Sequence, residues 1–179
     1  MGIVEVLAPS SAGRSHAPAC RRLLLALLRS TRRTSAGVTV LLTTDAEIRR
    51  LNRSFRNCDR TTDVLSFPFD GDLEPRKAHL GDIAISMPRA ARQARRAGWP
   101  LASEIALLIT HGYLHLLGYD HETDDGIMRR REVSLLRRIA RIDLSDRDLV
   151  LGGRADGEET GGARRHVGRS AVTGHWRKR

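Results

Sequence analysis

Three histidines that lie close together in the sequence have the spacing most typical of chemistry. His111 and His115 are four positions apart, and His121 follows six positions later. If residues 101–117 form a helix, the first two imidazoles lie on one face, one turn apart. Gly118 can end that helix, because glycine readily adopts the left-handed conformation common at helix C-termini. The chain can then bring the third imidazole to the same point, which gives the ligand set of a catalytic zinc ion.

The same spacing occurs in zinc proteases with the motif His-Glu-x-x-His-x-x-Gly-x-x-His. The glutamate that acts as general base in those enzymes corresponds here to Gly112, which cannot accept a proton. The pattern therefore predicts one zinc ion per chain, bound by His111, His115 and His121, without the base that a protease needs. A metalloprotease or another metal hydrolase stays open as an alternative function.

Three blocks of sequence together point to a known family. The histidine block reads His-Gly-x-Leu-His-Leu-x-Gly-Tyr-Asp-His over residues 111–121. A second block has Leu-Asn-Arg-Ser-Phe-Arg at 51–56 and Thr-Asp-Val-Leu-Ser-Phe-Pro-Phe at 62–69, and a third has Leu-Gly-Asp-Ile-Ala-Ile-Ser at 80–86. Together these blocks resemble the YbeY family, bacterial single-domain, metal-dependent endoribonucleases linked to ribosomal RNA maturation.

The resemblance implies a single-strand-specific endoribonuclease that acts in ribosomal RNA processing, at the 3′ end of the small-subunit RNA, and in ribosome quality control. It implies precursor ribosomal RNA and the ribosome or its associated proteins as partners. Arg56, in the Phe-Arg context of the family, is the catalytic residue expected beside the three histidines. Its planar guanidinium can pair bidentately with a phosphate and stays charged.

A second alternative is a non-catalytic, ribosome-associated RNA-binding module with a structural metal. A structural zinc site is normally closed by a fourth protein ligand, and no obvious fourth cysteine or histidine follows His121. Asp120 can orient a metal ligand by accepting its second N–H, or can simply form a turn. Asp63 and Ser66 can face the site from their strand or have structural roles, and His79 is expected in a polar surface loop.

The composition favours an anionic partner. Lysine and arginine number 31 against 21 acidic residues, which gives a formal charge of +10. Such a charge favours RNA through phosphate neutralisation, although a coding bias towards arginine explains it as well. Two cysteines make no disulfide framework, and neither a leader sequence nor a membrane-length apolar run is evident. We therefore expect a cytoplasmic protein without a membrane partner, and the sequence indicates no oligomeric state.

Apolar periodicity and turn residues predict a single α+β domain over residues 1–150, with a mixed sheet of about four strands and about five helices. The expected strands are residues 3–7, 38–42, 63–68 and 80–86. The expected helices are residues 19–33, 45–55, 88–97, 101–117 and 124–141, and loops are expected at 9–18 and 70–78.

The last part of the chain, residues 151–179, differs in composition from the rest. From Gly152 onward it contains seven basic and three acidic residues, a net charge of +4, and almost no aliphatic side chains. Too little apolar surface is present to offset the entropy of ordering, so a disordered basic tail is expected.

Overall fold

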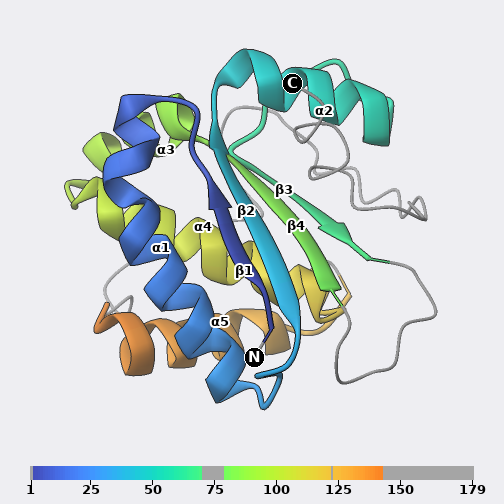
Figure 1. Ribbon diagram of the computed structural model, residues 1–179, viewed down its shortest axis with the longest axis vertical. Helices are drawn as coiled ribbons and strands as arrows, with labels where there is room; N and C mark the ends of the chain where they lie inside the picture. Colours follow the sequence, from blue (N-terminus) through green and yellow to red (C-terminus); the bar gives the residue numbers. More distant parts are fainter. Residues whose placement is uncertain (1, 70–78, 122, 143–179) are drawn as a thin grey trace.

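A four-stranded mixed sheet forms the centre of the protein (Figure 1). The computed structural model describes residues 2–69, 79–121 and 123–142. Strands β1, β2 and β4 are parallel, and β3 pairs antiparallel with β4 at the edge. The predicted mixed sheet of four strands is confirmed, in the order β1-β2-β4-β3, with bounds Val4–Leu7 (β1), Gly37–Thr43 (β2), Val64–Pro68 (β3) and His79–Ser86 (β4).

Strand β2 lies between two parallel neighbours, and all of its residues are buried. Val40, for example, pairs with Val6 of β1 on one side and with Ile83 of β4 on the other. A strand covered on both faces needs apolar side chains at successive positions, which explains the unbroken Val-Thr-Val-Leu-Leu run. The sheet therefore has helices packed against both of its faces.

Five α-helices surround the sheet, as predicted. Helices α1, α4 and α5 form the larger core with one face of the sheet, and α2 forms a smaller core with the other face (Figure 1). Helix α3 packs beside α4, and a short π-helical segment, Leu136–Ala140, follows α5. The helix bounds are Ser11–Ser30 (α1), Asp45–Arg56 (α2), Met87–Ala97 (α3), Leu101–Leu116 (α4) and Ile127–Leu135 (α5).

Helix α1 begins earlier than the sequence suggests, so the loop predicted for residues 9–18 is wrong beyond Ser10. The Ser10 side chain accepts a hydrogen bond from the Gly13 N–H, which satisfies one donor of the first helical turn. Gly13 is buried, and a Cβ there would lie 3.2 Å from the Ala8 Cβ, so the small residue permits close packing. Cap and packing outweigh the single helix hydrogen bond lost at Pro18.

Helix α4 is the element around which the domain packs. It contacts α1, α3, α5 and strands β3 and β4, and most of its residues are buried. The hydroxyl of Tyr113 on α4 is hydrogen-bonded to the Thr31 hydroxyl at 2.6 Å, which links α4 to the end of α1. Because the sheet and three helices hold it, α4 is a rigid support for the side chains that it carries.

The predicted tail, residues 151–179, lies outside the described residues, as does the whole of the loop expected at 70–78. Among the described helices, none combines the length and the apolar character needed to cross a lipid bilayer.

Candidate metal centre

The end of α4 has the geometry that reverses the chain. Gly118 adopts a left-handed conformation with φ of 88°, as predicted for a helix stop. Its N–H donates to the His115 carbonyl at 3.0 Å, and the Tyr119 N–H donates to the Leu114 carbonyl at 3.1 Å. These two bonds are those of a Schellman-type helix end. The chain therefore turns back immediately after α4 and carries His121 towards the helix.

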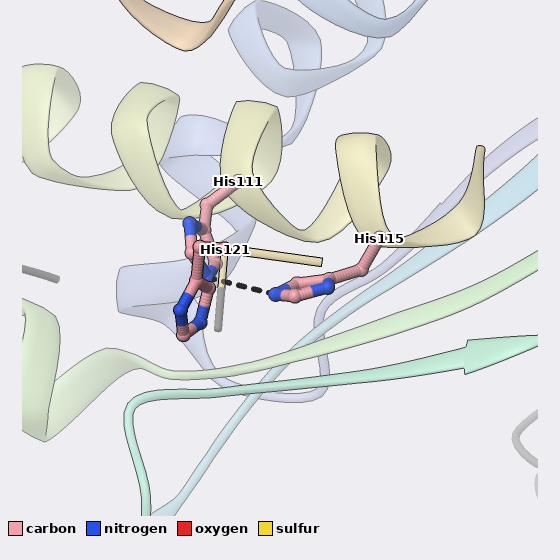
Figure 2. A group of neighbouring side chains, drawn as sticks. All are labelled: His111, His115 and His121. Atoms are coloured by element: carbon pink, nitrogen blue, oxygen red, sulfur yellow. Dashed lines mark hydrogen bonds between the residues drawn. The ribbon is translucent and has the colours of Figure 1, made fainter. Parts of the chain in front are cut away.

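The three histidines converge, as Figure 2 shows. One ligand-type atom from each residue lies within 4.8 Å of the others. The Nε2 atoms of His111 and His115 are 3.1 Å apart, and the ring of His121 lies 5.3 Å from each of their rings, measured between centroids. Two nitrogens bound to one tetrahedral zinc ion, each at about 2.0 Å, lie about 3.3 Å apart. The geometry thus fits a single divalent metal.

The remaining ring nitrogens of the two helical ligands face hydrogen-bond acceptors. The Nδ1 atom of His115 lies 3.0 Å from the Tyr119 carbonyl oxygen, and the Nδ1 atom of His111 lies 3.2 Å from Oε1 of Glu132. Acceptors at Nδ1 favour the tautomer that carries its proton there, so the Nε2 lone pairs point at each other. A shared cation stabilises two lone pairs in this arrangement, which supports the fit of the site to a metal.

The electrostatic surroundings keep His115 in the form that binds metals. Burial, and to a smaller extent the charges of His111, His121 and Arg56, lower its pKa from 6.5 to about 4, while the hydrogen bond to Tyr119 acts in the opposite direction. The imidazole of His115 is therefore neutral at pH 7 before any metal binds. No proton has to be removed from this ligand when the site is loaded.

Arg56 is the last residue of α2 and reaches β3. Its Nη2 donates to the Ser66 carbonyl at 3.3 Å. Burial lowers the pKa of Arg56, but from a value so high that the guanidinium stays charged at neutral pH. Because this charge contributes to the low pKa of His115, the guanidinium lies within electrostatic reach of the histidine cluster. The structure thus places the predicted cation near the predicted ligands.

Position 112 faces the sheet. A Cβ placed on Gly112 would lie 2.9 Å from Cγ2 of Ile83 and 3.0 Å from Oγ of Ser66. Helix α4 approaches the sheet too closely here for a larger side chain. A glutamate like that of the proteases has no room at this position, which argues against the metalloprotease alternative.

The weaker sequence candidates have different surroundings. Ser66 lies beside α4, as its contact with position 112 shows. The Asp63 carboxylate accepts from the Val64 N–H and from Nε2 of Gln93, both at 2.9 Å, so it joins the start of β3 to α3. The Asp120 carbonyl accepts from the Thr123 N–H in a turn, while the role of its carboxylate stays a prediction.

His79 was expected in a surface loop, and this expectation is wrong. It is the first residue of β4, and its Nε2 lies 2.8 Å from Oδ1 of the buried Asp82. The strand begins one residue earlier than its apolar pattern indicates, because this hydrogen bond and the pairing with Gly37 extend it.

Sequence reasoning missed Glu132, a residue that contacts the candidate metal site. It is only 1% exposed, and its second carboxylate oxygen, Oε2, accepts from Nη1 of Arg129 at 2.8 Å. A signal was present, since Glu132 lies four positions after Met128 and three before Leu135, on the apolar stripe of the last helix. An acidic residue at such a position requires a buried partner.

Comparison with known proteins agrees with this geometry. The family model described as "Endoribonuclease YbeY" matches residues 14–140, which is most of the chain. The chain belongs to the YbeY family. All three histidines, Arg56 and Glu132 lie within the matched region.

Curated YbeY relatives and one solved structure support the assignment. Endoribonuclease YbeY of Solibacter usitatus is 54% identical over 92 residues, which are 51% of this chain and 58% of the relative. That of Nautilia profundicola is 45% identical over 106 residues, 59% of this chain and 74% of the relative. The solution structure of TM1509 from Thermotoga maritima is 27% identical, with a TM-score of 0.57, over 76% of this chain and 89% of that protein. The chain thus shares its fold with a solved structure.

Proposed function

We propose that this YbeY-family protein is a zinc-dependent endoribonuclease that cleaves single-stranded RNA in ribosomal RNA processing. The observation that carries this proposal is the pair of Nε2 atoms of His111 and His115, 3.1 Å apart, with an acceptor behind each ring. The names of the relatives support RNA as the substrate class. Maturation of the small-subunit RNA 3′ end, ribosome quality control, ribosomal partners and a cytoplasmic location belong to the same proposal.

His111, His115 and His121 would hold the metal. Three neutral imidazoles match the preference of zinc, and a site with three protein ligands leaves a position open for chemistry. When bound, zinc supplies Lewis acidity that activates water and polarises a phosphoryl oxygen. The protein contributes the fixed ring orientations, since Tyr119 and Glu132 hold the Nδ1 atoms of two ligands.

Arg56 would bind and orient the scissile phosphate. Its guanidinium has five N–H donors in a fork. One of its nitrogens donates to the Ser66 carbonyl, so other donors of the fork can pair with phosphate oxygens. In a partly buried position the charge is screened less than at the surface, which strengthens its effect on charge that develops on the phosphate. The net charge of +10 would draw the polyanion towards the protein.

A cleavage assay with purified zinc-loaded protein tests this function. The substrate is a single-stranded RNA that covers the 3′ end of a small-subunit precursor, with the same sequence annealed to its complement for comparison. We expect internal cleavage of the single strand that stops with chelator and returns with zinc. Casein incubated in parallel should remain intact.

A His111→Ala variant is the control for contaminating ribonuclease. Cleavage that persists in this variant, or with chelator present, does not come from the proposed site. A zinc-loaded protein that binds RNA but cleaves none of the substrates would contradict the endoribonuclease proposal and favour an RNA-binding module. Digestion of casein would favour the protease alternative.

A further inference from the structure

We propose that Glu132, held by Arg129, is a positioning residue that fixes the orientation and tautomer of the metal ligand His111. This inference rests on the metal site of the proposed function and deepens it. It assigns a role to α5, which contributes none of the candidate metal ligands.

The two oxygens of the Glu132 carboxylate have different partners. Oε1 lies 3.2 Å from Nδ1 of His111, and Oε2 accepts from Nη1 of Arg129 at 2.8 Å. The carboxylate therefore lies between His111, a candidate ligand on α4, and Arg129, a cation on its own helix. Oε1 can accept a hydrogen bond from Nδ1 of His111 only when Nδ1 carries the single proton of the neutral ring. The lone pair is then on Nε2, which points away from Glu132 towards His115 and His121.

Burial of the Glu132 carboxylate costs free energy unless hydrogen bonds and an opposite charge compensate for it. Glu132 is 1% exposed, and a buried carboxylate must be paired and hydrogen-bonded to remain ionised. Arg129, whose side chain is 33% exposed, provides a charge-assisted hydrogen bond to Glu132. A carboxylate that accepts from a ligating imidazole raises the basicity of the ring and restricts its rotation, and loss of such a partner typically lowers metal affinity by about 10–100-fold.

A second buried glutamate in the same core provides a matched control. Glu104, near the start of α4, is 0% exposed, and its Oε2 accepts from Nε1 of Trp99 at 2.9 Å. It therefore has the burial and the chemistry of Glu132, but it accepts from a tryptophan, whereas Glu132 contacts a histidine of the cluster. Any general effect of neutralising a buried glutamate should appear in both residues.

The experiment measures zinc affinity of the full chain by competition with a chromogenic chelator, without RNA. We expect Glu132→Gln, which keeps an acceptor but loses the charge, to weaken zinc binding about tenfold, and Glu132→Ala about a hundredfold. Arg129→Gln should give a smaller loss, about threefold, because Glu132 remains next to His111. Glu104→Gln should bind zinc within about twofold of the unaltered protein.

A spectroscopic readout separates positioning from a structural role. In long-range proton–nitrogen NMR spectra of the metal-free protein at neutral pH, His111 should carry its proton on Nδ1. In Glu132→Ala it should become a mixture of tautomers while His115, held by Tyr119, stays unchanged. Unaltered zinc affinity, or the same tautomer of His111 in Glu132→Ala, would overturn the inference.

Folding is checked by thermal melts of the metal-free variants. If both Glu132 variants are unfolded while Glu104→Gln is folded, Glu132 belongs to the fold and the inference is wrong. The measurements of zinc affinity, tautomer and thermal stability do not require RNA. Weaker zinc binding in Glu132→Ala beside a loaded protein that cleaves no RNA would leave this inference standing and contradict only the proposed activity.

Discussion

In the part of the chain that the structure describes, two histidines each lie within hydrogen-bond distance of a buried carboxylate, and the two pairs use opposite nitrogens of the ring. In β4, Nε2 of His79 lies 2.8 Å from Oδ1 of Asp82. Between α4 and α5, Nδ1 of His111 lies 3.2 Å from Oε1 of Glu132. Both carboxylates are 1% exposed, so burial does not distinguish the pairs.

The difference lies in what the other nitrogen meets. Nε2 of His111 faces His115, whereas Nδ1 of His79 lies against the backbone at Gly37, where a Cβ would be 3.1 Å away. Within the residues that the structure describes, no third ligand-type side chain joins His79 and Asp82 to form a metal-binding group. A histidine–carboxylate contact therefore indicates a metal site only when the free nitrogens of several rings converge.

The largest expected difference between the two pairs comes from removing the imidazole of each pair in turn. Loss of one of three ligands removes about a third of a zinc binding free energy of order 12 kcal/mol, so His111→Ala should weaken zinc binding about a thousandfold. His79→Ala should leave zinc affinity unchanged, since its ring lies outside the cluster. Chelator competition and elemental analysis check both variants. Equal losses in the two variants would remove the distinction between the pairs.

The second expected effect is a pH dependence of the metal-free protein. His115 has a pKa of about 4 in the folded state against 6.5 in the unfolded chain, so the unfolded state binds more protons between these values. This contribution to stability is complete above pH 6.5 and is lost as the pH falls towards 4. The free energy of unfolding should drop by about 2 kcal/mol between pH 7 and pH 5.

Urea unfolding in the presence of chelator measures this drop. His115→Asn should show a clearly smaller pH dependence, because its amide does not titrate. A His115 titration near pH 6.5 in NMR spectra of the metal-free protein would contradict the expectation.

Arg56→Ala should lower RNA cleavage by at least about tenfold, or 1.4 kcal/mol of transition-state stabilisation, with zinc content unchanged. In the proposed function the guanidinium contacts the phosphate, and its hydrogen bond in the structure goes to the Ser66 carbonyl. Arg53→Ala, an exposed arginine on the same helix, is the matched control and should retain activity. Parallel loss of zinc in Arg56→Ala would instead assign this residue to the metal site.

The smallest expected effect comes from adding a methyl group beside each pair. In Gly112→Ala the new Cβ meets Ile83 and Ser66 below 3.1 Å, and overpacking outweighs the gain in helix propensity by about 1 kcal/mol. This variant should lower both the melting temperature and zinc affinity, because the backbone next to His111 has to shift. Gly37→Ala, beside His79, should leave zinc affinity unchanged. Higher stability of Gly112→Ala would show that α4 can move away from the sheet at no cost.

Periodicity and motif spacing predict most of the fold. The strand of residues 38–42 and the helix of residues 101–117 have unbroken apolar patterns, and both lie within a residue or two of their predicted bounds. The start of α1 was missed because the Pro, Ser and Gly residues of this stretch, Pro18 among them, favour a loop locally, whereas the close packing of the buried Gly13 depends on the rest of the fold. The last helix, predicted for residues 124–141, begins three residues later, at Ile127, and its last part, Leu136–Ala140, is π-helical.

The site was predicted where its residues are close in sequence. The histidines share one stretch, so helical geometry and a glycine suffice to bring them together. Glu132 was not found, because its contact with His111 depends on how α5 docks on α4, and pair contacts between helices cannot be derived from spacing. Arg56 was suggested by family resemblance alone, and no periodicity places α2 near α4.

The sharp turn at Gly118 makes the histidine cluster local in the chain. Its three side chains come from one helix and the turn after it, so closing a short loop brings them together once α4 has formed. Arg56 belongs to α2 and donates to the carbonyl of Ser66 on β3, so its distance from the cluster depends on how α4 packs against the sheet. A change that loosens this packing would therefore separate the arginine from the histidines while the cluster itself stays together, and under the proposed function it would leave a metal site that does not cleave RNA.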